Sequence, residues 1–166
     1  MSPQSAKVVV SIGSNIEPER HIRQALEAMK REFGPLRVSP VYRTSAVGFE
    51  GPPFLNLVVV FDAGLAVDEV IKRLRAIEAD AGRSRGGKEF DSRTLDLDVI
   101  LFGDHDLRGE GYNIPRKDIE RYAFVLEPLA DLLPEALHPV LHKRYAELWA
   151  EFDDERQQAE RIGLSF

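Results

Sequence analysis

Residues 94 to 102 read Thr94-Leu95-Asp96-Leu97-Asp98-Val99-Ile100-Leu101-Phe102, and this stretch decides the fold. Every second residue from Leu95 to Leu101 is apolar, which is typical of a β-strand that packs one face on a core. Asp96 and Asp98 then lie together on the opposite face. Because neighbouring carboxylates repel each other, holding them side by side is costly without a cation. The stretch therefore predicts a strand with a core face and an acidic face.

Five further elements precede this strand. They are identified by apolar periodicity, by β-branched runs and by the glycines and prolines between them. In chain order we expect a strand at 8–12, a helix at 18–33, strands at 36–42 and 54–61, and a helix at 67–82. The order strand, helix, strand, strand, helix, strand indicates a ferredoxin-like α+β fold, with both helices on one face of an antiparallel sheet. The other face remains for a ligand or for additional elements.

The rest of the chain is expected to add helices to this core. Residues 122–132 and 142–161 have helical patterns, and the second of these segments is charged and amphipathic. We expect a single domain over residues 1–166, with its core at 7–140 and a C-terminal helix at about 142–161.

Composition narrows the possible functions. The chain of 166 residues has no cysteine, which excludes disulfide scaffolds, thiol catalysis and cysteine-zinc sites. Its net charge of −6 argues against broad binding to nucleic acid or to an anionic membrane. The apolar runs are too short to cross a bilayer, and the first six residues lack a signal-peptide pattern. We expect a cytoplasmic monomer that acts on small molecules.

A basic segment directly precedes the acidic strand. Arg83, Arg85, Lys88 and Arg93 fall in a short, glycine-containing stretch of this otherwise acidic chain. Arginine binds phosphate oxygens in pairs, and Mg²⁺ is commonly held by one or two carboxylates plus substrate phosphates. Together the two features predict transfer of a phosphate-containing group from Mg-ATP. The alternative is an exposed strand face beside a solvated loop whose charges balance neighbouring acids.

The expected chemistry consists of positioning and charge neutralisation. Two metal ions bridged by Asp96 and Asp98 would neutralise the phosphates and activate an acceptor hydroxyl. Arg83 and Arg93 would stabilise charge that develops on the leaving group. The sequence contains neither a P-loop nor a Gly-x-Gly-x-x-Gly motif, which excludes P-loop enzymes, protein kinases and dinucleotide-dependent dehydrogenases of the usual form.

Four segments in a fixed order resemble the family of 6-hydroxymethyl-7,8-dihydropterin pyrophosphokinases of folate biosynthesis. They are Gly13-Ser14-Asn15, Tyr42-Arg43-Thr44 leading to Phe54-Leu55-Asn56, Glu78 through Arg83, and Arg93 through Asp98 followed by Leu101-Phe102-Gly103. Residues 123–129 also fit, so the resemblance covers approximately residues 7 to 140. It implies a ferredoxin-like fold and transfer of pyrophosphate from Mg-ATP to the pterin hydroxymethyl group, with release of AMP.

The resemblance also implies a role for individual residues. Asp96 and Asp98 would bind two Mg²⁺ ions, and Arg83 and Arg93 would assist the transfer. The residues implied for ATP are Arg85, Lys88, Phe90, Val99, Arg116 and Lys117. The pterin would lie between two aromatic rings and be hydrogen-bonded by an asparagine, and the residues implied for its pocket are Thr44, Val47, Phe54, Asn56 and Phe124.

The chain departs from the family pattern on the nucleotide side. Arg116 follows Pro115 where the family usually has a histidine, and Tyr122 stands where an arginine is usual. The sequence Asp91-Ser92 replaces a common Gly-Pro. These departures leave open a divergent paralogue with an altered substrate, or a non-catalytic pterin- or ATP-binding ferredoxin-like module.

A further alternative is another enzyme that uses an Asp-x-Asp pair, such as a nucleotidyltransferase or a glycosyltransferase. A nucleotidyltransferase of the polymerase-β kind needs its Gly-Ser shortly before the acidic pair. Here Gly13-Ser14 lies several elements upstream of Asp96, which argues against that class.

Overall fold

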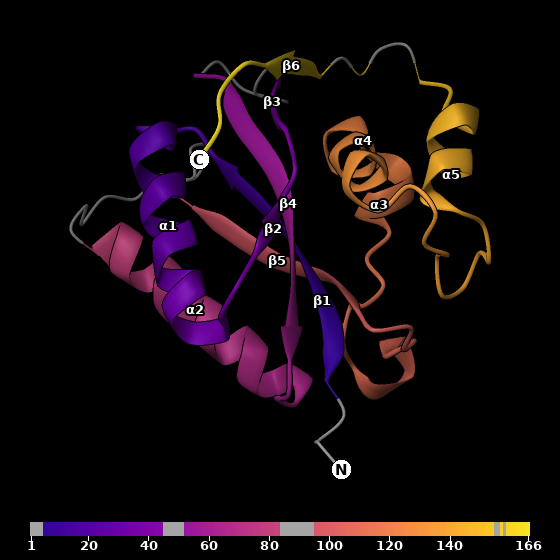
Figure 1. Cartoon of the computed structure of the whole chain (residues 1–166), viewed down its shortest axis with the longest axis horizontal. Coiled ribbons are helices and arrows are strands. Elements are labelled where there is room, and N and C mark those ends of the chain that lie inside the picture. The colour runs from indigo at the N-terminus through magenta and orange to yellow at the C-terminus, as the bar shows by residue number, and fades with distance from the viewer. Residues whose placement is uncertain (1–4, 45–51, 84–94, 155–156, 158) are drawn as a thin grey trace.

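The computed structural model describes residues 5–44, 52–83, 95–154, 157 and 159–166, and the order of its elements matches the sequence pattern up to residue 102 (Figure 1). The elements are β1 (Ala6–Ser14), α1 (Pro18–Phe33), β2 (Arg37–Val38), β3 (Val41–Thr44), β4 (Phe54–Ala63), α2 (Val67–Arg83), β5 (Asp96–Phe102), a 3₁₀ turn (Arg108–Glu110), α3 (Asp118–Arg121), α4 (Ala123–Leu132), α5 (Tyr145–Glu151) and β6 (Glu160–Ile162).

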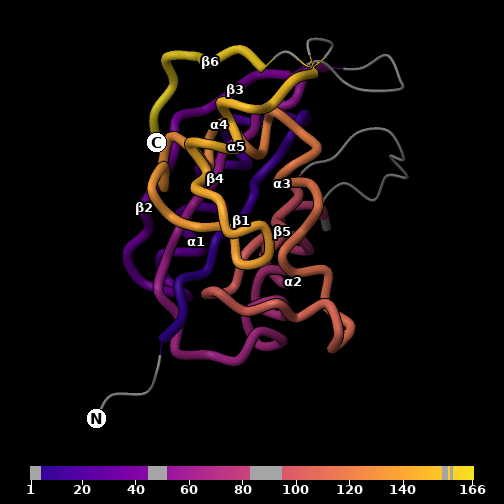
Figure 2. Tube along the Cα trace, turned by 90° about the vertical axis from the view of Figure 1, so that its right-hand side faces the viewer, coloured from indigo at the N-terminus to yellow at the C-terminus, as the bar shows by residue number. Residues whose placement is uncertain are grey.

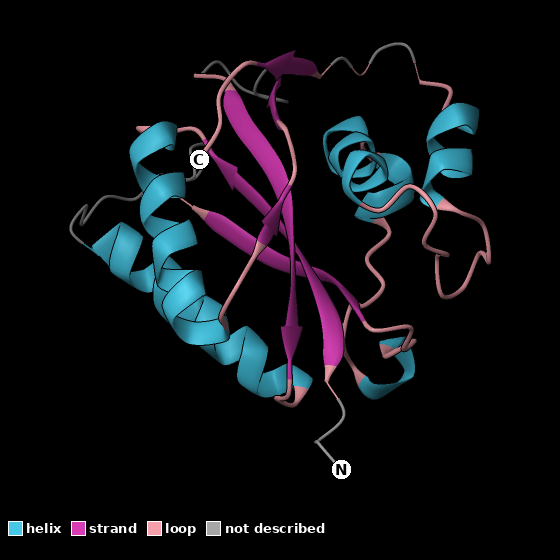
Figure 3. Ribbon diagram, viewed as in Figure 1, coloured by secondary structure: helices cyan, strands magenta, loops and turns pink. Residues whose placement is uncertain are grey.

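The strands form one antiparallel sheet in the order β5-β1-β4-β3-β6, with β2 paired to β4. Helices α1 and α2 cover one face, and α3, α4 and α5 lie on the other (Figure 3). The predicted ferredoxin-like α+β fold is therefore confirmed, with additional helices on the second face.

The strand expected at residues 36–42 is split into β2 and β3 by Ser39 and Pro40. Proline has no backbone N–H to give to a sheet, so it interrupts the ladder. The Ser39 N–H donates to the Val58 carbonyl at 2.9 Å, and the Val58 N–H donates to the Ser39 hydroxyl oxygen at 2.9 Å. The serine thus keeps the chain attached to β4 across the break.

The core between the sheet and helices α1 and α2 follows the predicted alternation. Residues that point to this side recur at every second strand position and at helical spacing, which makes one continuous apolar layer. Its fully buried members include Val8, Val10, Ile12, Ile22, Met29, Leu57, Val59, Val70 and Leu74. Leu97 and Val99 of β5 belong to it, as expected, and so does Leu95, which directly precedes this strand.

A second core joins the opposite face of the sheet to α4 and α5, and Leu101 belongs to it. The expectation that Leu101 shares a face with Leu97 is wrong, because the β1–β5 register shifts between Val9 and Val10. Such an irregularity turns the following side chain to the other face. Figure 2, which looks from the side of α3, α4 and α5, shows these helices over the sheet.

The prediction of a helix at about residues 142–161 is also wrong. The observed helix α5 ends at Glu151, and Glu160–Ile162 forms β6 instead. Strand β6 pairs with the edge of β3, and Arg43 Nη2 lies 2.9 Å from Glu160 Oε1. An uncovered edge strand leaves backbone groups unpaired, so a strand there satisfies hydrogen bonds that a longer helix would not. Local periodicity carries no information about that distant edge.

The helices that the structure describes contain no segment long and apolar enough to cross a membrane.

Candidate active site

A row of three residues, Asp96, Gly13 and Asn56, crosses β5, β1 and β4 at one end of the second face. The register places Gly13 of β1 opposite Asp96 of β5 on one side and opposite Asn56 of β4 on the other. Asn56 in turn faces Tyr42 of β3. Because alternate residues share a face, Asp98 lies on the same side as Asp96. The pairing thus brings the acidic pair and Asn56 to one surface of the sheet.

Gly13 is the residue that lets this row pack closely. A Cβ atom at Gly13 would lie 3.3 Å from Asn56 Oδ1 and 3.9 Å from a ring carbon of Phe54. Asn56 is 5% exposed, and its Nδ2 donates a 2.9 Å hydrogen bond to Thr44 Oγ1. The amide orientation is therefore fixed by Thr44, and its oxygen lies over the bare backbone of Gly13.

Asp96 and Asp98 are half-buried, so each carboxylate remains accessible to a ligand. Asp98 Oδ1 lies 3.6 Å from Arg75 Nη2 of helix α2. Among the residues that the structure describes, no group of three or more His, Cys, Asp or Glu side chains is gathered to hold a metal ion. A pair of carboxylates alone suits Mg²⁺, which keeps several positions for water and substrate phosphates.

Helix α2 braces the strand between the two aspartates. Glu78 Oε2 accepts a 2.7 Å hydrogen bond from the Leu97 N–H, and Glu78 Oε1 accepts one of 2.9 Å from Arg75 Nη1. Arg75 Nη1 also donates to the Leu97 carbonyl at 2.9 Å. Strand β5 is the edge of the sheet, so these side chains replace a missing neighbouring strand. Glu78 and Arg75 therefore fix the backbone that carries the acidic pair.

Burial raises the pKa of the Glu78 carboxyl above its ordinary value, and the nearby charge of Asp98 adds to this effect. The hydrogen bond from Leu97 and the charge of Arg75 lower the pKa in part. The sequence marked Glu78 only as part of a motif, and it gave no reason to select Arg75. The sequence signal for this pair is the spacing of three residues between Arg75 and Glu78, which places both side chains on one face of a helix.

Two of the predicted aromatic residues also lie on the second face. Phe54 of β4 and Phe124 of α4 are both half-buried. Tyr122, the departure from the family pattern, stacks on Phe124 with ring centres 5.1 Å apart and an angle of 23° between the rings. Gln157 holds this segment, because its Oε1 accepts a 2.9 Å hydrogen bond from the Ala123 N–H. Sequence reasoning did not identify Gln157.

The predicted nucleotide residues are only partly brought together. Arg116 Nη2 lies 3.4 Å from Asp118 Oδ2, while Arg116 Nε is buried and has no hydrogen-bond partner among the described residues. Lys117 is exposed at the start of α3. Val99 is 6% exposed in the core beneath α1 and α2, so its side chain points away from the face of Asp98.

The remaining predicted residues fall outside the described part of the chain. They are the side chain of Arg83 and the whole of Val47, Arg85, Lys88, Phe90 and Arg93.

Comparison with known proteins gives a consistent assignment. The family model of 7,8-dihydro-6-hydroxymethylpterin-pyrophosphokinase matches residues 9–134. A 2-amino-4-hydroxy-6-hydroxymethyldihydropteridine pyrophosphokinase of Pseudomonas aeruginosa is 39% identical over 137 residues, covering 80% of this chain and 84% of the relative. The mitochondrial folate synthesis bifunctional protein of Pisum sativum is 33% identical over 137 residues, covering 81% of this chain and 26% of that protein.

Solved structures agree on the fold. The wild-type HPPK-DHPS of Plasmodium falciparum superposes with a TM-score of 0.70 at 13% identity, covering 90% of this chain. The chain spans 43% of that structure's length, which corresponds to one part of a larger protein. The match over residues 9–134 and the 39% identity to a bacterial relative establish the family. The chain belongs to the 7,8-dihydro-6-hydroxymethylpterin-pyrophosphokinase family, whose members are ATP-dependent diphosphotransferases.

Proposed function

We propose that this chain transfers the pyrophosphoryl group of ATP to the hydroxymethyl group of 6-hydroxymethyl-7,8-dihydropterin and releases AMP. The observation that carries the proposal is the register that places Asp96, Gly13 and Asn56 in one row. A metal-binding carboxylate and a buried amide thereby lie on the same surface, as a reaction between a pterin and a triphosphate requires. The named relatives favour this catalytic role over a non-catalytic binding module.

The acidic pair fits Mg²⁺, and we propose that Asp96 and Asp98 hold two ions. Both carboxylates are accessible, and hard oxygen ligands are those that this cation prefers. The ions would neutralise phosphate charge when bound. The positive charge of Arg75, 3.6 Å from Asp98, offsets part of the repulsion between the two carboxylates.

The pterin is proposed to bind between Phe54 and Phe124. A flat heterocycle stacks well on aromatic faces, and both rings lie on the second face of the sheet. The Asn56 amide, oriented by Thr44, would hydrogen-bond the polar edge of the ring. Val47 would complete the pocket, as the family resemblance implies.

The triphosphate is proposed to bind the basic groups on both sides of β5. Arg116 supports this, because its side chain is 27% exposed and its Nε has no hydrogen-bond partner among the described residues. Lys117 is exposed beside it. The family resemblance supplies the rest of the phosphate and base contacts from Arg83, Arg85, Lys88, Phe90 and Arg93. Val99 would contribute through its backbone, since its side chain packs in the core.

The bonds that change follow from the products. Because AMP leaves, the hydroxymethyl oxygen forms a bond to the β-phosphorus while the bond from that phosphorus to the bridging oxygen of AMP breaks. The transfer needs an aligned acceptor and neutralised charge more than a covalent intermediate with the protein. Asn56 and the aromatic pair would align the acceptor, and the acidic pair with the arginines would balance the charge.

The direct test is incubation with Mg-ATP and the pterin, followed by detection of AMP and pterin pyrophosphate. We expect both products in equal amounts. A protein that binds the pterin but forms no AMP would contradict the proposal.

Replacing Phe54 by alanine separates the two ligands. The variant should bind the pterin about tenfold or more weakly, because stacking of a base on an aromatic ring is worth roughly 1–3 kcal/mol. ATP affinity should change little, and both affinities are measured by calorimetric titration. The matched control is Phe152→Ala, which removes a ring stacked on Trp149 away from the site. Equal loss of both ligands in the Phe54 variant would indicate a folding role instead.

A further inference from the structure

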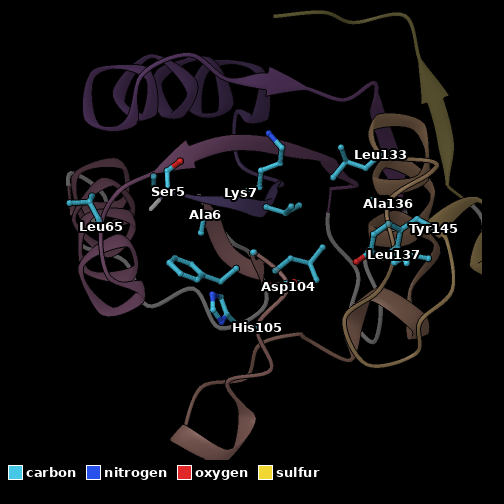
Figure 4. Close-up of a pocket in the computed structure, with 15 residues that line it drawn as sticks. Ser5, Ala6, Lys7, Leu65, Asp104, His105, Leu133, Ala136, Leu137 and Tyr145 are labelled. Atoms are coloured by element: carbon cyan, nitrogen blue, oxygen red, sulfur yellow. The ribbon is translucent and has the colours of Figure 1, made fainter. Parts of the chain in front are cut away.

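A cavity separate from the proposed active site lies at the other end of the sheet, at the start of β1 and the end of β5 (Figure 4). Its volume is about 470 Å³, within the range of sites for small molecules, which is roughly 300–1,000 Å³. The start of β1, the end of β5 and the segment that joins α4 to α5 enclose it. Strand β1 therefore has Lys7 at this cavity and Gly13 in the proposed pterin site.

The interior of the cavity is apolar on both sides. Val9 and Leu101 line it from the sheet and are 2% and 4% exposed. Leu133 and Ala136 line it from the helical layer. Apolar walls on two sides favour an organic ligand over a chain of water molecules, because a bound water needs two to four polar partners.

One polar atom is directed at this apolar space. Tyr145 is 1% exposed and lines the cavity from α5. Its N–H donates to the Ala136 carbonyl, but its hydroxyl makes no hydrogen bond with any residue in the described ranges. Because the hydroxyl oxygen is not fully buried, it is open to the cavity and can donate a hydrogen bond to a ligand there. Burial also raises the pKa of Tyr145, so the hydroxyl stays protonated and able to donate.

The charges at the rim set the charge of the ligand. Lys7 Nζ lies 3.3 Å from Asp62 Oδ1, so the cation at the rim is already paired. Asp104 and His105 are exposed on the opposite side and can donate to or accept from a polar group. With the lysine paired and a carboxylate close by, the rim does not favour a strongly anionic ligand.

We propose that this cavity is a second ligand site that takes a small, uncharged, largely apolar molecule with a carbonyl or ether oxygen. The oxygen accepts the hydrogen bond of the Tyr145 hydroxyl, and the apolar body lies between Leu101 and Leu133. The site is separate from that of the pterin and ATP, and its occupancy does not depend on the transfer reaction.

The test uses two probes of nearly equal shape, 4-fluoroacetophenone and 1-ethyl-4-fluorobenzene, followed by fluorine NMR titration of the full chain. The ratio of their dissociation constants is compared between the wild type and Tyr145→Phe. We expect the hydroxyl to favour the ketone by about 3- to 10-fold, the effect of a single hydrogen bond, and the variant to lose that preference. Tyr112→Phe, which alters a tyrosine away from the cavity, should keep it.

Location is read from proton–nitrogen correlation spectra of the labelled chain at the same ketone concentrations, and independence is read from the fluorine spectra. Backbone amide shifts caused by the ketone should be confined to residues 6–7, 101–105, 133–137 and 145, and saturating ATP with the pterin should not displace the probe. An unchanged ratio in Tyr145→Phe, displacement by the substrates, or shifts scattered over the surface would overturn the proposal and indicate an adventitious additive only. Absence of binding by both probes would overturn it as well.

Discussion

Gly13 determines how closely the proposed pterin pocket can pack. Its strand neighbours place Asp96 on one side and Asn56 on the other, and the missing side chain leaves room for the Asn56 amide and the Phe54 ring. The backbone of Gly13 needs no unusual conformation, so its requirement is space alone. This separates binding from stability, because an added methyl group affects the pocket without straining the chain.

We therefore predict that Gly13→Ala lowers pterin affinity about 3- to 10-fold with little loss of stability. The new Cβ, 3.3 Å from Asn56 Oδ1, should push the amide from its preferred rotamer, which costs roughly 0.5–1.5 kcal/mol. Gly64→Ala is the matched control, since a Cβ there meets no atom within 4 Å. Calorimetric titration with the pterin gives the affinities. Unchanged binding by the Gly13 variant would show that Asn56 does not contact the ligand.

The acidic pair was predictable from sequence, whereas the role of Gly13 was not. Alternation along a single strand is local, so it places Asp96 and Asp98 on one face without further information. The closeness of Gly13 to Asn56 depends on which strands pair and in what register. No local pattern contains that register, although the Gly-Ser-Asn motif marked the position.

Strand β5 and helix α2 act as one unit at the edge of the sheet. Arg75 and Glu78 satisfy both backbone groups of Leu97, the residue between the two aspartates. The side-chain pair thus performs the task of a neighbouring strand while leaving Asp96 and Asp98 only half-buried on the second face. The contact between α2 and β5 therefore positions Asp96 and Asp98.

The Glu78 carboxylate is predicted to stabilise the fold through its hydrogen bonds. Glu78→Ala leaves the Leu97 N–H without its partner and should lower the free energy of unfolding by roughly 1–3 kcal/mol. Glu78→Gln keeps an acceptor for that N–H and should lose less. Urea denaturation measures both variants, and equal losses would contradict the assigned hydrogen bond.

Wild type and Glu78→Gln should also differ in how their free energy of unfolding depends on pH. The pKa of Glu78 is raised above its ordinary value of 4.5, so the folded state retains a proton that the unfolded state has released. Wild-type stability should therefore fall as pH rises from that value through the raised pKa. Glu78→Gln has no such proton, and its stability relative to wild type should increase over the same interval. A constant difference across this range would contradict the raised pKa.

Most elements were predictable because their signals are local, whereas the errors at Leu101 and after Glu151 have non-local causes. The β1–β5 irregularity turns Leu101 to the second face, and only the pairing with Val9 reveals it. The chain after Glu151 pairs with the edge of β3, where the sequence alone favoured a helix. A charged, amphipathic sequence is compatible with a helix and with an edge strand, so the available edge of β3 decides which of them forms.

On the scale of the whole molecule, one part of the second face of the sheet is packed against helices and the other parts carry the proposed binding sites. Helices α4 and α5 bury its centre, while the ends carry the acidic row and the separate cavity. Tyr42 attaches α4 to this face, because its hydroxyl on β3 donates a hydrogen bond to Asp131 of α4. The C-terminal segment closes the molecule, with Leu164 and Phe166 packed on the core beneath α1 and α2.

Removing residues 160–166 should lower the melting temperature by about 5–10 °C. The deletion removes strand β6 and three partly buried apolar side chains, Ile162, Leu164 and Phe166, which together contribute roughly 2–3 kcal/mol. Each kcal/mol is worth about 2–4 °C at this size. It also uncovers the edge of β3, so aggregation should increase with concentration. Phe166→Ala keeps β6 and loses only the side chain that lies under Arg23, so it should have a smaller effect. An unchanged melting temperature would contradict the role of β6.

The central claim is that Asp96 and Asp98 hold the magnesium that pyrophosphoryl transfer needs. The most direct measurement is the initial rate of AMP formation against Mg²⁺ concentration for wild type, Asp96→Asn and Asp98→Asn, with Asp68→Asn as an exposed control. We predict that each site variant loses about 100-fold or more in rate while pterin affinity is kept, and that the control behaves as wild type. Wild-type rates and magnesium dependence in either site variant would contradict the claim.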